Sequence, residues 1–126
     1  MMNIKEKIKR LKEQIKKQGM GYEMMMPKKN LDKFIEYFKK KPNVEIEETH
    51  RTKCLYYIYY TVRVEGLKYA FNVTVYDNNN NYRLVIDPFF FNPGTDIEVL
   101  PRYIKYYEAV VKDFRNFFKT LESFAH

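Results

Sequence analysis

Two runs rich in β-branched and aromatic residues, Cys54–Val64 and Leu67–Tyr76, flank the dipeptide Glu65-Gly66. Such runs favour β-strands, and a dipeptide that tolerates positive φ favours the two-residue turn of a hairpin. A two-residue turn determines which residues face each other, and along one face every facing pair is apolar. These pairs are Val64 with Leu67, Val62 with Tyr69, Tyr60 with Phe71, Ile58 with Val73 and Tyr56 with Val75. Because a one-residue shift would exchange the two faces, turn and pattern together predict the register.

The second face of this predicted hairpin is polar and aromatic. It carries Leu55, Tyr57, Tyr59, Thr61 and Arg63 on the first strand and Lys68, Ala70, Asn72, Thr74 and Tyr76 on the second. Cys54 is expected on the apolar face. If helices pack on the apolar face, the second face is exposed, and an exposed patch of this kind usually marks an interface.

Two more strands extend the hairpin into a sheet. Residues 44–47 alternate Val and Ile with Glu, which is typical of an edge strand whose acidic side resists unwanted pairing. After the hairpin, residues 77–80 read Asp-Asn-Asn-Asn and predict a turn. Pairing Val75 with Tyr82 across that turn creates a fourth strand. Its apolar side chains are Tyr82, Leu84 and Ile86.

Two helices are predicted before the sheet. Residues 3–18 repeat isoleucine or leucine at 4-3-4 spacing, a narrow seam that should pack on its own domain or on a second copy. A Met-rich connector follows, and its three consecutive methionines fit neither helix nor strand patterning. Asn30 is expected to cap the second helix, which Pro42 ends.

The last helix has the cleanest pattern in the chain and starts near residue 102. At 100° per residue its apolar side chains share one half of the helix surface, which should lie along the apolar face of the sheet. They are Ile104, Tyr107, Val110, Val111, Phe114, Phe117, Phe118 and Leu121.

The fold class that follows is α+β, in the order ααββββα. It is a four-stranded antiparallel meander with two N-terminal helices and one long C-terminal helix, all packed mainly on one face. At 126 residues the chain should form a single domain, 1–126, without metals or disulfides. Within it, residues 1–29 hold the basic helix and the connector, a candidate mobile segment.

The net charge of +7 is unevenly distributed. Residues 1–42 hold 13 basic and 5 acidic side chains, a net +8, whereas residues 43–100 hold 5 and 8, a net −3. A basic end attracts nucleic acid, an anionic surface or an acidic protein. Lys, Asn, Tyr, Phe and Ile, whose codons are AT-rich, are abundant and suggest an AT-rich genome, archaeal or viral.

The compartment predicted from the sequence is the cytoplasm. The single cysteine cannot form an internal disulfide, and the N-terminus lacks the apolar region of a signal peptide. No apolar run approaches the ~20 residues of a membrane span.

The residue composition gives little support to a catalytic function. Ser123 is the only serine, and four glycines are too few for a phosphate-cradling loop or a dinucleotide fingerprint. The side chains of Glu45, Glu47, Glu48 and His50 are of types that bind metal ions, but strand alternation sends neighbouring residues to opposite faces. A metal-dependent nuclease remains the less favoured alternative. Its candidate residues are Glu65, Lys68, Asp87 (expected opposite Ala70), Asp96 and Glu98.

A non-enzymatic binding protein is therefore the expected function, with no cofactor, metal, membrane or small-molecule substrate indicated. Aromatic side chains interleaved with cations on a sheet suit single-stranded nucleic acid, through stacking and phosphate contact. The candidate binding residues combine this face with the lysine-rich N-terminal region. They are Tyr57, Tyr59, Arg63, Lys68, Tyr76, Arg83, Lys9, Lys12 and Lys16. The alternative is a protein–protein interaction module, either a homodimer or an inhibitor of a host or viral machine, because tyrosine also packs well in subunit interfaces.

Overall fold

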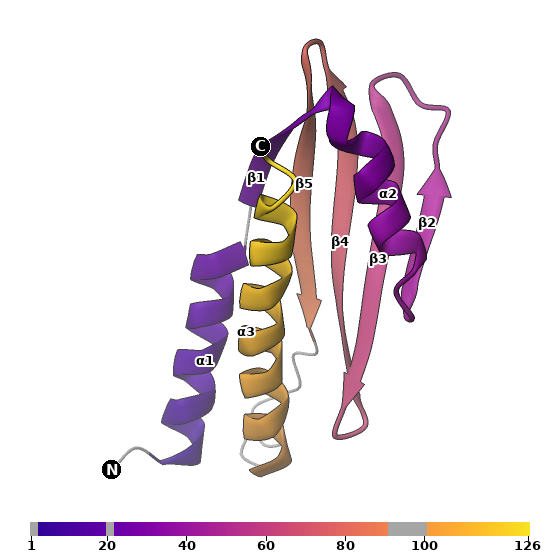
Figure 1. Ribbon diagram of the computed structural model, residues 1–126. Helices are drawn as coiled ribbons and strands as arrows, with labels where there is room; N and C mark the ends of the chain where they lie inside the picture. Colours follow the sequence, from indigo (N-terminus) through magenta and orange to yellow (C-terminus); the bar gives the residue numbers. More distant parts are fainter. Residues whose placement is uncertain (1–2, 20–21, 91–100) are drawn as a thin grey trace.

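The computed structural model describes residues 3–19, 22–90 and 101–126 (Figure 1). A sheet forms one layer and helices form a second layer on one of its faces. The elements are α1 (Ile4–Gly19), β1 (Tyr22–Pro27), the 3-10 turn η1 (Lys28–Asn30), α2 (Leu31–Lys39), β2 (Val44–Glu48), β3 (Cys54–Val64), β4 (Leu67–Asn78), β5 (Asn81–Phe90) and α3 (Pro101–Glu122). The α+β class predicted from the sequence is confirmed.

The described sheet has five antiparallel strands in the order β1-β5-β4-β3-β2. Strands β2 to β5 form the predicted meander. The prediction of four strands is wrong by one, because β1 pairs along the outer edge of β5. The segment that the sequence predicts as a Met-rich connector is therefore largely a strand.

Strand β1 escapes the sequence pattern because methionine occupies both of its faces. Met26 is fully buried on the helix side and Met24 is half-buried there, whereas Met25 between them is 46% exposed on the other side. A strand is recognised by its apolar–polar alternation, and three apolar residues in a row conceal that period.

The β3–β4 hairpin has the predicted register. Tyr56 lies opposite Val75, Val64 lies opposite Leu67, and the pairs between them follow in step. Glu65 and Gly66 both have positive φ, 53° and 77°, as a two-residue turn that matches the strand twist requires.

A β-bulge separates Cys54 from Tyr56 and changes the face of two residues. Cys54 pairs with Tyr76, so its side chain lies on the tyrosine side of the sheet and not, as predicted, on the apolar side. Leu55 is the extra residue, and it lines a small hollow with Tyr56 and with Leu31 of α2. The expectation that Leu55 belongs to the tyrosine face is therefore wrong.

The β4–β5 turn is tighter than predicted. Asn78 pairs with Asn81, so Val75 lies opposite Leu84 and not opposite Tyr82. A shift of two residues keeps every side chain on its face, and Leu84 and Ile86 are fully buried as expected. The shift does change the neighbours across the two strands.

The core lies between the sheet and α3, which buries aromatic and aliphatic residues along its length. Tyr103 and Tyr106, absent from the predicted apolar half, are also buried. The buried stripe is wider than half of the helix because α3 packs against the sheet and also against α1, which lies beside it (Figure 1). The Tyr106 hydroxyl donates a hydrogen bond of 2.7 Å to the backbone oxygen of Lys68, which joins α3 to the end of β4.

Helix α1 packs on its own domain, the first of the two predicted alternatives. Ile8 and Ile15 are buried against the core, and Nζ of Lys7 lies 3.5 Å from Oε1 of Glu108 in α3. Ile4, at the start of α1, stays partly exposed.

Asn30 does not cap α2 with its side chain, contrary to the sequence prediction. Its amide Nδ2 instead donates hydrogen bonds of 2.9 Å to the backbone oxygens of Phe124 and His126. Figure 1 shows the C-terminus beside the junction of β1 and α2. A buried amide therefore ties the last residues of the chain to that junction.

The carboxylate of Asp113, in α3, accepts hydrogen bonds from two tyrosine hydroxyls of the sheet. Tyr69 donates to Oδ2 of Asp113 over 2.8 Å, and Tyr60 donates more weakly to Oδ1 over 3.4 Å. Burial and the neighbouring negative charge raise the pKa of Tyr60 to about 12 and raise that of Tyr69 as well.

Candidate functional site: the open face of the sheet

The face of the sheet opposite the helices carries no described helix (Figure 1). We call it the open face. Because side chains alternate along each strand and facing residues share a side, the register arranges its residues in cross-strand rows. From the β4–β5 turn to the β3–β4 turn, the rows are Cys54–Tyr76–Arg83–Met25, then Glu47–Tyr57–Thr74–Val85–Glu23, then Glu45–Tyr59–Asn72–Asp87, then Thr61–Ala70–Phe89, and finally Arg63–Lys68.

The candidate tyrosines Tyr57, Tyr59 and Tyr76 all lie on the open face and are partly exposed. The rings of Tyr57 and Tyr59 are 6.3 Å apart and inclined by 33°, so they form one aromatic platform across two rows. A hydrogen bond with the Cys54 thiol raises the pKa of the Tyr57 hydroxyl.

Arg83 and Tyr76 are already engaged with each other. The guanidinium carbon of Arg83 lies 4.7 Å from the Tyr76 ring centre, and its Nη1 lies 2.9 Å from Oε1 of Glu23. A cation that is paired with a carboxylate attracts a phosphate less strongly than an unpaired one. The structure therefore leaves Arg83 the least available of the three candidate sheet cations.

Arg63 and Lys68 face each other in the last row and are both exposed. Neither makes an ion pair with another residue in the described part of the chain. The hydrogen bond from Tyr106 to the backbone of Lys68 fixes the strand beneath this row. These two cations form the unpaired positive end of the open face.

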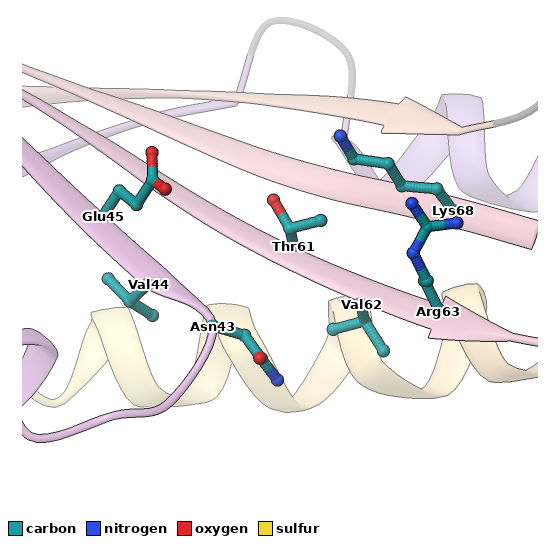
Figure 2. Close-up of a pocket in the computed structure, with 7 residues that line it drawn as sticks. All are labelled: Asn43, Val44, Glu45, Thr61, Val62, Arg63 and Lys68. Atoms are coloured by element: carbon teal, nitrogen blue, oxygen red, sulfur yellow. The ribbon is translucent and has the colours of Figure 1, made fainter.

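A hollow lies between this positive end and the tyrosine platform. Figure 2 shows Glu45, Thr61 and Lys68 on the open side of the sheet and Val62 on the side of α3. The hollow has a volume of about 780 Å³, and a second one of about 480 Å³ adjoins it toward β5. The two share Glu45, Thr61 and Lys68, so they are adjacent, and together we call them the groove.

The lysines predicted to bind with the tyrosines lie elsewhere. Lys9, Lys12 and Lys16 belong to α1, which packs in the helix layer on the other side of the sheet. Nζ of Lys12 lies 5.8 Å from the ring centre of Tyr107 in α3. Helix α1 carries seven basic and two acidic side chains, a net +5. The structure therefore separates the two halves of the predicted binding site, and a single ligand could touch both only by passing around an edge of the sheet.

The residues considered for metal chemistry are not gathered into one site. Asp87 lies opposite Asn72, not opposite Ala70, and this places it two rows from Lys68. Among the described residues, no three His, Cys, Asp or Glu side chains lie close enough together to hold a metal ion. Asp96 and Glu98 are outside the described residues.

Sequence reasoning missed Phe89 and Met25 as members of this face. Phe89 is 56% exposed, the most exposed of the large apolar side chains in the described part of the chain. Its place beside Ala70 follows from the β4–β5 register, which the sequence predicts two residues out of step. A two-residue Asn-Asn turn, assumed in place of the four-residue loop, would have predicted this register and the position of Phe89.

Comparison with known proteins identifies no relative: no family model, curated protein or solved structure matches the chain. None of the helices in the described ranges has the length and apolar character needed to cross a membrane.

Proposed function

We propose that this protein binds single-stranded nucleic acid on the open face and catalyses no reaction there. The observation that carries the proposal is the aromatic platform of Tyr57 and Tyr59, which no described helix covers. It is continued by the cations Arg63 and Lys68, which make no ion pair within the described residues. Bases stack on exposed aromatic rings whatever their identity, and the backbone phosphates follow a line of cations.

The distribution of charge on this face sets the expected strength of binding. Three cations stand among four carboxylates, which are Glu23, Glu45, Glu47 and Asp87. The attraction for phosphate is therefore concentrated at the Arg63–Lys68 end, and a strand of a few nucleotides should bind weakly. A longer strand that passes the edge of the sheet reaches the net +5 of α1 and should bind more tightly with a steeper salt dependence.

The test is a titration of dye-labelled strands of 8 and 30 nucleotides, followed by fluorescence anisotropy at 50 and 200 mM salt. Removing a ring on which a base stacks costs ~1–3 kcal/mol. We therefore expect Tyr59→Ala to raise the Kd of both strands by about tenfold. Tyr37→Ala, a tyrosine in the helix layer, is the matched control and should leave both Kd values within about twofold. Absence of binding at 50 mM salt would exclude the proposal.

A protein partner, including a second copy of the chain, is the second candidate. It is favoured by the nearly balanced charges of the open face and by the exposed side chains of Met25 and Phe89 at its two ends. Light scattering would then give twice the mass of one chain, and Tyr59→Glu would return the mass to that of a monomer. A monomeric mass with retained strand binding would exclude self-association on this face.

A further inference from the structure

We propose that the groove between the tyrosine platform and the Arg63–Lys68 row is a subsite for one nucleotide whose base carries an exocyclic amino group. This rests on the proposed function, since it assigns one position of the bound strand to one place on the open face. The feature that carries it is the polarity of the groove, with cations at one end and carboxylates at the other.

The floor of the groove is low because two small residues face each other there. Thr61 lies opposite Ala70, and the rows on both sides of this pair carry longer side chains. Adjacent rows are about 7 Å apart, twice the rise per residue of a strand. The floor is therefore wide enough for a flat ring to lie on it, with the neighbouring rows as walls.

Two aromatic side chains border this floor. Phe89 is the direct neighbour of Ala70 across β4 and β5, and Tyr59 stands one row away. Both line the smaller part of the groove, together with Asn72 and Tyr69. A 56% exposed phenylalanine beside an uncovered floor offers a base one ring for contact along its edge or face.

The charged groups are separated along the strands. Arg63 and Lys68 occupy the row on one side of the floor, whereas Glu45 and Asp87 occupy the row on the other side, with Asn72 between them. In the part of the chain that the structure describes, no ion pair joins any of these four charged residues to a partner. A ligand that matches this arrangement presents an anion at one end and hydrogen-bond donors at the other.

A nucleotide with an exocyclic amino group has this chemistry. Its phosphate suits the guanidinium of Arg63 and the ammonium of Lys68. The amino group of cytosine, adenine or guanine donates to a carboxylate or to the side-chain oxygen of Asn72, as acidic side chains accept from cytosine in other complexes. Thymine and uracil carry a carbonyl oxygen where cytosine carries the amino group, and they should leave the carboxylates without a donor.

The experiment compares dye-labelled eight-residue strands of dC and of dT by fluorescence anisotropy at 50 mM salt. We expect the wild-type protein to bind the dC strand about tenfold more tightly. Ala70→Leu fills the floor and should abolish this preference while the dT strand keeps its affinity within about twofold. Thr74→Leu, on the same strand and face but outside the groove, is the matched control and should retain the preference.

Further variants separate the subsite from the proposed function. Phe89→Ala, at an exposed position that does not endanger folding, should also reduce the preference, as should the double variant Glu45→Gln with Asp87→Asn. Equal affinity of the wild type for dC and dT, with both still weakened by Tyr59→Ala, would overturn the subsite and leave the proposed function standing. Failure of both strands to bind would overturn both proposals, and an unchanged preference in Ala70→Leu would overturn this location of the subsite.

Discussion

The two faces of the sheet use the same strands and differ in what covers them. Phe71 of β4 is 1% exposed beneath α3, whereas Phe89 of β5 is 56% exposed on the open face. Phe71 contacts four rings on the helix side, those of Tyr60, Tyr69, Phe114 and Phe117. The difference teaches that aromatic content alone does not locate the core of this domain. On one face the rings hold the layers together, and on the other they are available to a partner.

The largest effect on stability should appear when one phenylalanine on each face is replaced by alanine. Phe71→Ala is expected to lower the free energy of unfolding by ~3–5 kcal/mol, because it leaves a cavity among four packed rings. Phe89→Ala should lower it by less than about 1 kcal/mol, because the ring is already in contact with water. Urea unfolding followed by circular dichroism measures both. Equal losses would show that the open face is covered by part of the molecule.

Raising the pH should destabilise the protein mainly through the covered face, where burial holds the hydroxyls of Tyr60 and Tyr69 neutral. The folded pKa values of Tyr60 and Tyr69 lie above the ordinary value of 10, so the fold favours the neutral hydroxyls. Their stabilisation is fully present below pH 10 and is lost as the pH rises from 10 through about 12. We expect the urea midpoint to fall across that interval. The double variant Tyr60→Phe, Tyr69→Phe is the control and should show a smaller fall, whereas an identical fall would contradict the assignment.

A smaller effect is expected at the junction of β1 and α2. Asn30→Ala removes a buried amide that satisfies the backbone oxygens of Phe124 and His126, and should cost ~1–2 kcal/mol. Asn30→Asp provides the sharper comparison, because a carboxylate cannot donate to those oxygens. Thermal unfolding should rank the wild type above Asn30→Ala and Asn30→Ala above Asn30→Asp. An Asn30→Asp variant as stable as the wild type would contradict the role of the amide.

The smallest effect should be at the open face itself. Arg83→Ala breaks the ion pair with Glu23 and the contact with Tyr76, and exposed ion pairs contribute ~0–1 kcal/mol. The melting temperature should therefore change by only a few degrees. Lys68→Ala, which breaks no ion pair within the described part of the chain, is the control. A loss above about 2 kcal/mol in Arg83→Ala would mean that the open face contributes to the fold as the covered face does.

The sequence was most informative where two independent signals agreed. The Glu65-Gly66 turn and the apolar pattern both specify the pairing of β3 with β4, and the structure has that pairing. The same agreement places Tyr57 and Tyr59 on the open face. The predicted face is wrong for Cys54. A single extra residue in a strand does not change the local composition, yet it moves its neighbours to the other face.

The groove depends on relations between strands that no single stretch of sequence contains. Ala70 faces Phe89 because the β4–β5 turn uses two residues, and the longer predicted loop places Asp87 there instead. Strand β1 was hidden by apolar side chains on both its faces. The burial of Tyr103 depends on helix packing in three dimensions, and the pattern of α3 alone does not indicate it.

The hydrogen bonds from Asn30 to the backbone of Phe124 and His126 have a consequence for how the chain folds during its synthesis. The Asn30 amide cannot form these hydrogen bonds until Phe124 and His126 have left the ribosome. Helix α1 packs against α3, and β1 pairs with the edge of β5, so both must also wait for later parts of the chain. The β2–β5 meander, in contrast, pairs only neighbours in sequence and can form while translation continues. We therefore expect the first third of the polypeptide to be the last to dock, which makes it the segment most exposed to proteases and chaperones in a nascent chain.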